Sequence, residues 1–393
     1  MVYFTDIRKM YLFTFLVELT FFGAIAVPFF IEWGKLNYAQ IFVLEAWFIS
    51  WVFLLEIPTG VVADRVGRKY SLFLGSLIGA IGFAAYTIAP NFYWFLLGEF
   101  IVAIALAFMS GADTALIYDL LKKQKKQKQA KLIFSRYRIF NTLGIVIGAP
   151  AGSVIAGMVL WPYPTNLTLP FLLTAVPLLA GSLVALTIKE KRKVKFRESY
   201  TRTAINGVKY LSKHKILRVL ATDLIVISGT LFFMFWFYQS LMGKYGINIA
   251  FNGFVTAGFS IFSILLLMKI GAIEKLVGTR RMLFLSALIP GLFYLGLAWI
   301  NSFVFAIFAI FVITSLGSIR RPIFDHYMNS YIKSKDRATV LSTISMFGRL
   351  FIGILYPLVG ILADISLESA FLILGVLTII FAVVFRTSEN ILK

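Results

Sequence analysis

Apolar segments long enough to cross a membrane recur along the whole chain and are separated by short polar stretches. A helix of about 20 residues is needed to cross a hydrocarbon core of roughly 30 Å. The segments show no alternation of polar and apolar residues, so they predict helices and not the strands of a membrane barrel. The sequence therefore predicts an all-α polytopic membrane protein with twelve transmembrane helices, at residues 9–31, 39–62, 71–90, 92–120, 135–161, 167–188, 216–242, 247–272, 281–300, 302–329, 338–363 and 368–386.

The composition and the placement of the basic residues predict the orientation. Of the 393 residues, 60% are hydrophobic and 14% are charged, against roughly 25% charged residues in an average soluble domain. If the N-terminus is cytoplasmic, only Lys35 and Lys244 of the 38 lysines and arginines fall in loops on the outer side, as the positive-inside rule requires. We therefore expect a multi-pass protein of the cell membrane, plasma or inner, with both termini in the cytoplasm.

The formal net charge of +20 does not require a nucleic-acid partner, because the membrane topology alone explains the basic loops. We expect the tract Lys122–Lys131 to be a solvated loop. Attraction of this tract to anionic lipids at the inner face is the second interpretation.

Several kinds of chemistry lack the residues they would need. The chain has no cysteine, two histidines and no evident metal-ligand spacing, so we expect no metal site and no cofactor. It has no G-x-x-x-x-G-K-[ST] loop, which argues against a pump driven by ATP. We expect the protein not to be an enzyme and to act as a monomer.

The chain is predicted to form two six-helix halves, 1–188 and 216–393, joined by a basic cytoplasmic linker at 189–215 that contains an amphipathic segment. In that segment Ile205, Val208 and Leu211 share one helical face, which suits a helix on the membrane surface. A shift of 211 residues aligns GVVADRVGRKYSLFLGSLI (60–78) with GAIEKLVGTRRMLFLSALI (271–289), and eight of the 19 positions are identical. Such a parallel repeat is typical of transporters whose halves rock to alternate access to a site at the midplane.

The first copy of the repeat carries a family resemblance. GVVADRVGRK (60–69) resembles the signature loop of the major facilitator superfamily, and it lies between the second and third predicted helices, as that loop does. EIPTG (56–60), SGADTALIYD (110–119) and DRATVLS (336–342) are similar to a microbial branch of that superfamily, distantly similar to the drug:proton antiporters. Two departures separate the chain from those antiporters. Glu99 lies where they have a buried arginine, and GIVIGAPAGSVIAG (144–157) is a partial version of their helix 5 motif.

The resemblance implies a cytoplasmic latch. In the family the aspartate of the loop, which corresponds to Asp64, latches the two halves together, and a basic residue of the loop pairs with an acid at the inner end of helix 4. In the second copy of the repeat Lys275 stands where Asp64 would be, so only the first half carries the acid. The alternative interpretation is that these charges only anchor the topology. The predicted latch comprises Gly60, Asp64, Arg65, Gly67, Arg68, Lys69 and Asp119.

Ionisable residues inside the predicted helices are the candidates for binding substrate or protons, because each costs about 2.5–3.5 kcal/mol at the helix centre. Arg349 and Glu18 lie near the middle of predicted helices that line the cavity in the family, so they are the first candidates for a central site. The full set of candidates is Glu18, Glu99, Asp113, Asp223, Arg320, Asp325 and Arg349.

Two predicted helices concentrate these groups. Glu99 and Asp113 are spaced so that one continuous helix would present both within about 40° of each other, facing a wet cavity where they could take up and release protons. Pro322 is expected to break the tenth helix next to Arg320 and Asp325, which is a common place for a gate or a site. For Glu18, Glu99 and Asp113, a fixed ion pair or a hydrogen bond between helices is the alternative.

These observations predict a secondary active transporter that moves a small organic solute by alternating access and is coupled to protons. Arg349 would suit an anionic solute and the surplus of acids a cation, so the charge of the solute stays open at this point. The alternative functions are a translocator of lipids or hydrophobic molecules, and a non-transporting membrane sensor on the same fold.

Overall fold

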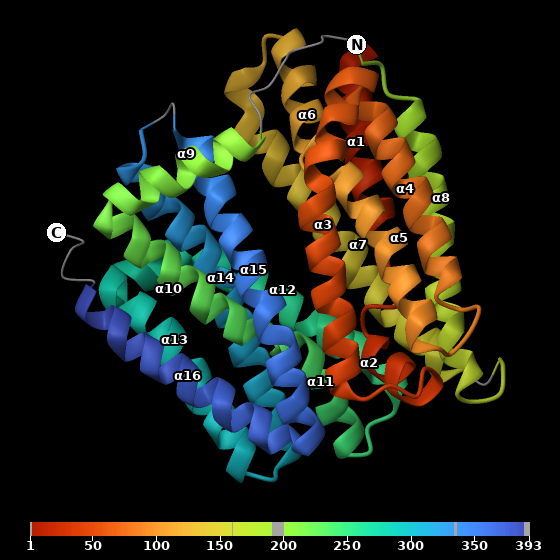
Figure 1. Ribbon diagram of the computed structural model, residues 1–393, viewed down its shortest axis with the longest axis vertical. Coiled ribbons are helices and arrows are strands. Elements are labelled where there is room, and N and C mark those ends of the chain that lie inside the picture. Colours follow the sequence, from red (N-terminus) through yellow and green to blue (C-terminus); the bar gives the residue numbers. More distant parts are fainter. Residues whose placement is uncertain (1, 159, 191–199, 334–335, 389–393) are drawn as a thin grey trace. The chain divides into compact units, whose positions relative to one another are not determined.

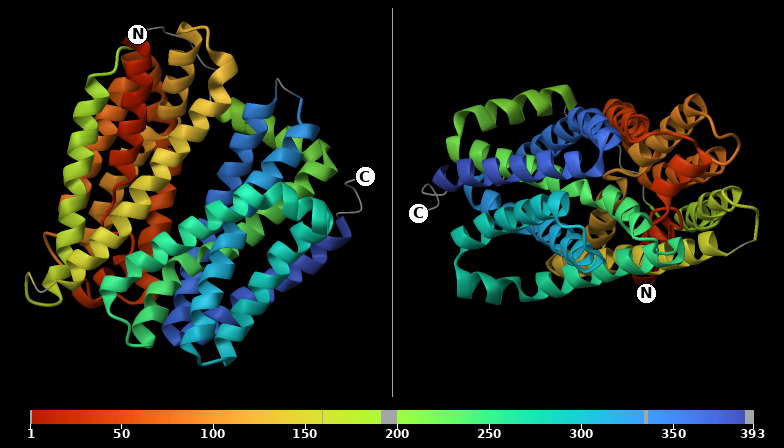
Figure 2. Two further views of the ribbon diagram at one scale, coloured as in Figure 1. Left: turned by 180° about the vertical axis from the view of Figure 1, so that it is seen from behind. Right: turned by 90° about the horizontal axis from the view of Figure 1, so that it is seen from below.

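The computed structural model describes residues 2–158, 160–190, 200–333 and 336–388, and every regular element among them is a helix. The chain divides into two compact units (Figures 1 and 2). Unit 1 consists of Met1–Arg197 and Ile247–Ala257, and unit 2 consists of Glu198–Gly246 and Gly258–Lys393. The predicted linker lies partly outside the described residues, at 191–199.

Unit 1 is built from long helices that pack side by side, α4 against α8 and α5, α3 against α5, and α1 against α7 (Figures 1 and 2). Its buried core joins side chains of α1, α4, α6, α7 and α8. Its helices are α1 (Val2–Glu18), α2 (Ala26–Pro28), the π-helix η1 (Phe29–Trp33), α3 (Tyr38–Val66), α4 (Arg68–Ala85), α5 (Phe92–Met109), α6 (Ala112–Lys123), η2 (Gln127–Gln129), α7 (Ala130–Gly157), η3 (Thr165–Leu167) and α8 (Thr168–Leu186).

Unit 2 is organised in the same way, with α13 packed against α16 and α14, and α10 against α14 and α16. Its core gathers buried side chains of α9, α10, α13, α14 and α15. Helix α12 contributes its first turns to unit 1 and the remainder to unit 2. The helices of unit 2 are α9 (Tyr200–Lys213), α10 (Lys215–Phe232), α11 (Met234–Lys244), α12 (Asn252–Val277), α13 (Thr279–Trp299), α14 (Phe303–Tyr331), α15 (Arg337–Ile365) and α16 (Leu367–Ser388), whereas η4 (Ile249–Phe251) belongs to unit 1.

Ten helical stretches among the described residues are long and apolar enough to cross a membrane. Helices are required there because lipid offers no hydrogen-bond partners, so each backbone group must be satisfied within its own segment. The ten do not include the first and third predicted segments. Helix α1 has 17 residues, and α4 begins with Arg68 and Lys69.

The prediction of one continuous helix over 9–31 is wrong, because α1 ends at Glu18 and regular helix resumes only at Ala26. The break is held by tertiary contacts, since the backbone N–H of Phe21 donates to Thr174 Oγ1 at 3.0 Å. The glycines of α7 lie against this stretch. A Cβ at Gly148 would lie 2.9 Å from the backbone nitrogen of Thr20, and a Cβ at Gly152 would overlap the carbonyl of Phe21. The glycines of α7 therefore leave the space that the irregular backbone after α1 occupies.

Two other predicted helices are divided, and one predicted break is missing. Segment 92–120 forms α5 and α6, separated at Gly111, whose φ of +73° is in the left-handed region that glycine adopts without strain. Segment 216–242 forms α10 and α11, separated at Phe233. The predicted break at Pro322 is wrong, because α14 runs through it. A proline removes one N–H donor, and here the packing of α14 against α10 and α13 holds the helix.

The internal repeat recurs in the backbone. Gly67 lies between α3 and α4 with φ of +126°, and Gly278 lies between α12 and α13 with φ of +82°. Both positions have ψ of 145°, so the aligned glycines make the same kind of reversal. Only glycine adopts this conformation readily, which explains why the repeat retains it at both positions.

The amphipathic face predicted for the linker is divided between two environments. Leu211 of α9 is 6% exposed and belongs to the core of unit 2, whereas Ile205 and Val208 are exposed. Gly207 lies against Thr343 of α15. Helix α9 is therefore attached to unit 2 through Leu211 and its neighbours, whereas Ile205 and Val208 face outward.

Candidate functional site

A chain of hydrogen bonds in unit 1 connects two of the predicted acids. Asn141 Nδ2 donates to Glu18 Oε1 at 2.7 Å and is 3.4 Å from Thr14 Oγ1. The Tyr137 hydroxyl donates to Asp113 Oδ2 at 2.7 Å and is also hydrogen-bonded to Thr14. The network thus runs from Glu18 to Asp113 through one amide and two hydroxyl groups.

Three helices supply this network at helical spacing. Thr14 and Glu18 are four residues apart on α1, as are Tyr137 and Asn141 on α7, so each pair shares a helix face. Asp113 comes from the first turn of α6. Glu18 is therefore the last residue of α1. The prediction that it lies near the middle of a helix is wrong. The polar partners on α7 were missed, although their i, i+4 spacing in an apolar helix was a usable signal.

Glu99 lies apart from this network. It is 4% exposed on α5, it is hydrogen-bonded to Tyr86, and it interacts electrostatically with Glu45 of α3. The predicted stripe of Glu99 and Asp113 on one continuous helix is wrong, because the break at Ser110 and Gly111 places the two acids on different helices.

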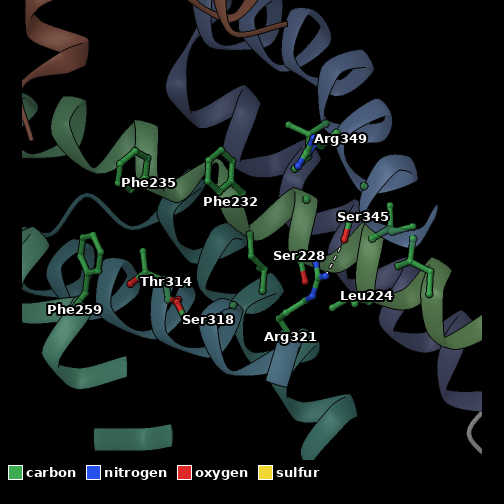
Figure 3. Close-up of a pocket in the computed structure, with 17 residues that line it drawn as sticks. Leu224, Ser228, Phe232, Phe235, Phe259, Thr314, Ser318, Arg321, Ser345 and Arg349 are labelled. Atoms are coloured by element: carbon green, nitrogen blue, oxygen red, sulfur yellow. Dashed lines mark hydrogen bonds between the residues drawn. The ribbon is translucent and has the colours of Figure 1, made fainter. Parts of the chain in front are cut away.

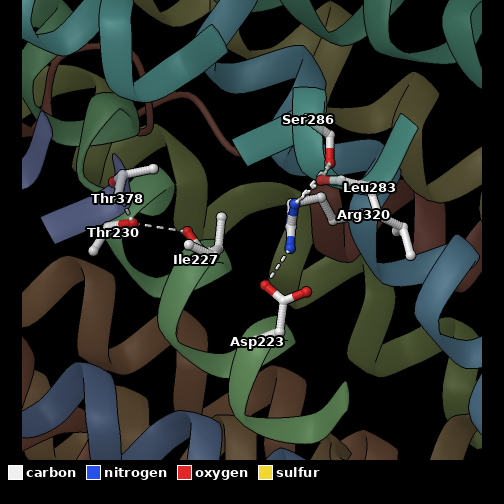
Figure 4. Close-up of polar contacts among 7 residues, drawn as sticks. All are labelled: Asp223, Ile227, Thr230, Leu283, Ser286, Arg320 and Thr378. Atoms are coloured by element: carbon white, nitrogen blue, oxygen red, sulfur yellow. Dashed lines mark hydrogen bonds and ion pairs between the residues drawn. The ribbon is translucent and has the colours of Figure 1, made fainter. Parts of the chain in front are cut away.

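Asp223 and Arg320 form a buried ion pair in unit 2 (Figure 4). Arg320 Nη2 donates to Asp223 Oδ1 at 2.7 Å, and Nη1 donates to Ser286 Oγ at 2.6 Å and to the carbonyl of Leu283 at 3.0 Å. The Arg320 side chain is fully buried and that of Asp223 is 9% exposed. The pair connects α14 to α10 and α13, so Asp223 and Arg320, both predicted as candidates for binding substrate or protons, form a fixed ion pair with each other.

The neighbouring arginine has a different environment. Arg321 Nε lies 3.3 Å from Asp325 Oδ2 one turn further along α14, and both side chains are exposed. Arg321 Nη2 donates to Ser345 Oγ of α15 at 3.0 Å. Consecutive arginines therefore face opposite directions, one into the core of unit 2 and the other into a pocket.

That pocket has a volume of about 570 Å³ and lies among α10, α11, α12, α14 and α15 of unit 2 (Figure 3). Arg349, a predicted site residue, lines it together with Arg321. In Figure 3, Phe235 and Phe259 lie at one side of the pocket and the two arginines at the other, with Phe232 between them. The remaining lining is aliphatic or carries hydroxyl groups, at Leu224, Ile225, Ser228, Gly229, Leu231, Thr314, Gly317, Ser318, Ile344, Ser345, Gly348 and Ile352.

A second cavity of about 570 Å³ lies between α1 and α7 in unit 1. Arg8 and Arg136 line it, and its other lining residues are apolar or aromatic. Both cavities thus combine two arginines with apolar surface and have no acidic residue in their lining.

The signature loop brings Arg68 and Asp119 together. Arg68 Nη1 lies 2.6 Å from Asp119 Oδ2 and also donates to the carbonyl of Ala115 at 2.8 Å, so it joins α4 to α6. Of the other predicted latch residues, Gly60 and Asp64 lie in α3, whose last turn includes Arg65. Lys69 Nζ lies 4.8 Å from the centre of the Tyr70 ring.

The first turn of α4 is bound by a carboxylate from a distant part of the chain. The backbone N–H groups of Arg68 and Lys69 donate to Glu190 Oε1 and Oε2 at 3.1 and 3.0 Å. A carboxylate is favourable there because a helix N-terminus carries unpaired N–H groups and a positive dipole end. Sequence reasoning named no partner for these N–H groups and missed Glu190, which follows α8 in an otherwise basic stretch.

Among the described residues, no group of three or more histidine, aspartate or glutamate side chains could hold a metal ion. The sites of unit 1 and unit 2 are therefore built from hydrogen bonds, ion pairs and apolar surface.

Comparison with known proteins identifies the family. The model of the Major Facilitator Superfamily matches residues 10–244 and 224–390, and so spans nearly the whole chain. The chain belongs to the major facilitator superfamily. Members of this superfamily are in general transporters and not enzymes.

The relatives share the fold more than the sequence. The chain is 31% identical over 103 residues to Solute carrier family 22 member 2 of Rattus norvegicus, covering 26% of this chain and 18% of that protein. The nucleoside transporter NupG aligns over 98% of this chain and 99% of that one, with a TM-score of 0.78 and 14% identity. A bacterial homologue of the human lysosomal transporter Spinster aligns over 98% of this chain and 96% of that one, with a TM-score of 0.77 and 16% identity. These likenesses show the fold.

Proposed function

We propose that the protein is a secondary transporter that moves a small organic solute by alternating access and couples this movement to protons. In this proposal the chain crosses the cell membrane twelve times, in halves 1–188 and 216–393, with both termini in the cytoplasm. The distribution of lysine and arginine supports that orientation. Membership of the superfamily supports transport itself.

The observation that carries proton coupling is the network between Glu18 and Asp113. An acid within a membrane helix is costly and marks a functional site unless its charge is satisfied by a fixed partner. Glu18 has an amide donor in Asn141, and the charged groups of Arg138 and Asp113 lie near enough to act on it. A proton bound by Glu18 would therefore change the charge balance of a hydrogen-bonded network that also contains Asp113.

A change of access would change the water around this pair. Water stabilises the charged form of a carboxylate, and burial stabilises the neutral form. Opening of the site to water would therefore favour release of a proton, and closure would favour its binding. The hydroxyl groups of Thr14 and Tyr137 are able to donate or accept as the charge of the pair changes. This is the physical basis of the proposed coupling.

The signature loop is proposed to bias the conformational equilibrium. The Arg68–Asp119 pair fixes the start of α4 to α6, and Glu190 fixes the same turn through its backbone N–H groups. Asp64 lies one turn before this junction and is the residue on which we expect the equilibrium to depend.

The test is a screen of radiolabelled solutes in proteoliposomes, with and without an imposed pH gradient. For a solute that is transported, we expect Glu18→Gln and Tyr137→Phe to lose uptake driven by the gradient while retaining exchange of labelled for unlabelled solute. Glu32→Gln is the matched control, because Glu32 lies in η1 outside the network, and it should behave like the unmodified protein.

Each result decides between functions. Saturable uptake that ignores the gradient would reject proton coupling and retain transport. Absence of flux for every solute, together with scrambling of labelled lipid between leaflets, would favour the translocator of lipids or hydrophobic molecules. Absence of both activities would favour a membrane sensor.

A further inference from the structure

The pocket of unit 2 has a composition that selects one class of solute. We propose that the transported solute is an amphipathic organic anion, which binds Arg349 and Arg321 through its anionic group and lies against Phe232, Phe235 and Phe259 with its apolar part. This inference rests on the proposed transport function and adds the charge and shape of the solute.

The charge of the lining is the first argument. Both ionisable side chains of the lining are guanidinium groups, and none of its residues is an aspartate or a glutamate. A cation in this pocket would meet two positive charges without a counter-ion in the lining, whereas a carboxylate, sulfonate or phosphate would be attracted by both. A guanidinium also matches such groups geometrically, because its N–H donors form a planar fork.

The two predicted site acids of unit 2, Asp223 and Asp325, are each paired with an arginine. Asp223 is bound to the fully buried Arg320 and is not part of the pocket lining. Asp325 lies 3.3 Å from Arg321 in an exposed pair, and such pairs contribute little because water screens them. Arg321 is held toward α15 by its hydrogen bond to Ser345, which orients the fork at the pocket wall.

An unsatisfied hydroxyl group in the lining is the second, independent argument. Ser228 Oγ is buried and has no hydrogen-bond partner among the described residues. A buried polar atom without a partner costs about 1–3 kcal/mol, so native structures rarely retain one without a ligand or water to satisfy it. Ser228 and Arg321 both line the pocket, and rotation of the Ser228 side chain would allow its hydroxyl to donate to an oxygen of a bound anion (Figure 3).

The size and the apolar side of the pocket define the rest of the solute. Its volume of about 570 Å³ falls within the roughly 300–1,000 Å³ of pockets that bind drug-sized molecules. The phenylalanines lie across from the arginines in Figure 3, so a solute that contacts both must have separate charged and apolar ends. An inorganic anion would fill only the charged side.

The test compares three compounds with the same apolar body and different charge: 4-phenylbutyrate, 4-phenylbutylamine and 4-phenylbutanol. Binding to the purified full chain in detergent is measured by thermal stabilisation, and entry is measured in proteoliposomes. We expect 4-phenylbutyrate to stabilise the protein and to be transported, and the amine and the alcohol to do neither.

The variants locate the site. Arg349→Gln and Arg321→Gln should each weaken binding of 4-phenylbutyrate about tenfold or more, as expected for loss of a hydrogen bond to a charged group. Arg349→Lys should restore part of the loss, and Ser228→Ala should give a smaller one. Arg281→Gln is the matched control, because Arg281 lies at the start of α13 and does not line the pocket, so it should leave binding unchanged.

The inference is overturned if the amine or the alcohol binds as tightly as the acid, if binding survives in both arginine variants, or if none of the three compounds stabilises the folded protein. Its failure differs from failure of the proposed function. Saturable flux of some other solute would keep the transporter and reject only the anion, whereas absence of flux for every compound in the wider screen would reject transport.

Discussion

Replacement of Arg320 by glutamine tests the energetic role of the buried pair in unit 2. Arg320 is fully buried and makes hydrogen bonds to Asp223, Ser286 and Leu283. Glutamine lacks the charge and the fork, so Asp223, which is 9% exposed, would remain buried without a guanidinium. Removal of one partner of a buried pair costs about 3–5 kcal/mol. We expect Arg320→Gln to lower the free energy of unfolding by that amount.

The adjacent arginine provides a matched control. Arg321→Gln removes the same side chain from the next position of α14, but the Arg321–Asp325 pair is 52% and 37% exposed. Exposed pairs contribute about 0.2–1 kcal/mol, so this variant should unfold almost like the unmodified protein. The measurement is unfolding of the purified protein in mixed detergent and denaturing detergent, followed by tryptophan fluorescence and circular dichroism.

A double variant separates the loss of the pair from the burial of a lone charge. In Asp223→Leu with Arg320→Met both charges are removed and the volume is largely filled, so stability should return to near or above that of the unmodified protein. Ser286 retains a partner, because its hydroxyl donates to the carbonyl of Leu283 at 2.8 Å. The reasoning is refuted if Arg320→Gln costs no more than Arg321→Gln, or if the double variant is no more stable than the single one.

Three further predictions concern unit 1. Gly152→Ala should destabilise the fold by about 1–3 kcal/mol or more, because a Cβ there overlaps the Phe21 carbonyl. Gly243→Ala is the control, because a Cβ there meets nothing within 4 Å. It should change stability by less than about 1 kcal/mol in the same unfolding assay. Glu190→Ala should cost about 0.5–2 kcal/mol, because it removes the carboxylate that binds the first turn of α4. Asp336→Asn should cost less, because the Asp336 side chain is at an N-cap but makes no capping hydrogen bond. Equal losses would contradict the role of Glu190. Asp64→Asn should shift the protein toward the inward-open state and slow transport. Single reporter cysteines on the cytoplasmic side are a clean probe in a chain without native cysteine, and unchanged labelling would reject the latch.

The helical spans were the most predictable part of the fold. Among the described residues, ten of the predicted spans contain a helical stretch long and apolar enough to cross a membrane. These spans were predictable because a long apolar segment in lipid must satisfy its backbone hydrogen bonds by forming a helix. The glycines of the repeat were predictable for a related reason, since a positive φ at Gly67 and Gly278 excludes most other residues. The pairing of Arg68 with Asp119, implied by the family resemblance, is present as a contact at 2.6 Å.

The breaks within helices were less predictable. The end of α1 at Glu18 depends on a hydrogen bond from Phe21 to Thr174 and on the glycines of α7, more than 100 residues away. The continuity of α14 through Pro322 likewise depends on packing against other helices. Local sequence describes neither contact.

The sequence by itself determined the membrane environment, the helical class and the set of ionisable residues to consider, because apolar length and charge placement are properties of single segments. Only the tertiary structure decided what each ionisable residue does. It placed Arg320 against Asp223 and Arg321 in a pocket, although the two arginines are adjacent in the chain. It joined Glu18 to Asp113 through side chains of α7 and left Glu99 with Tyr86. The physical reason is that the free energy of a charge inside a membrane protein depends on its partners across helices, which are set by packing in three dimensions.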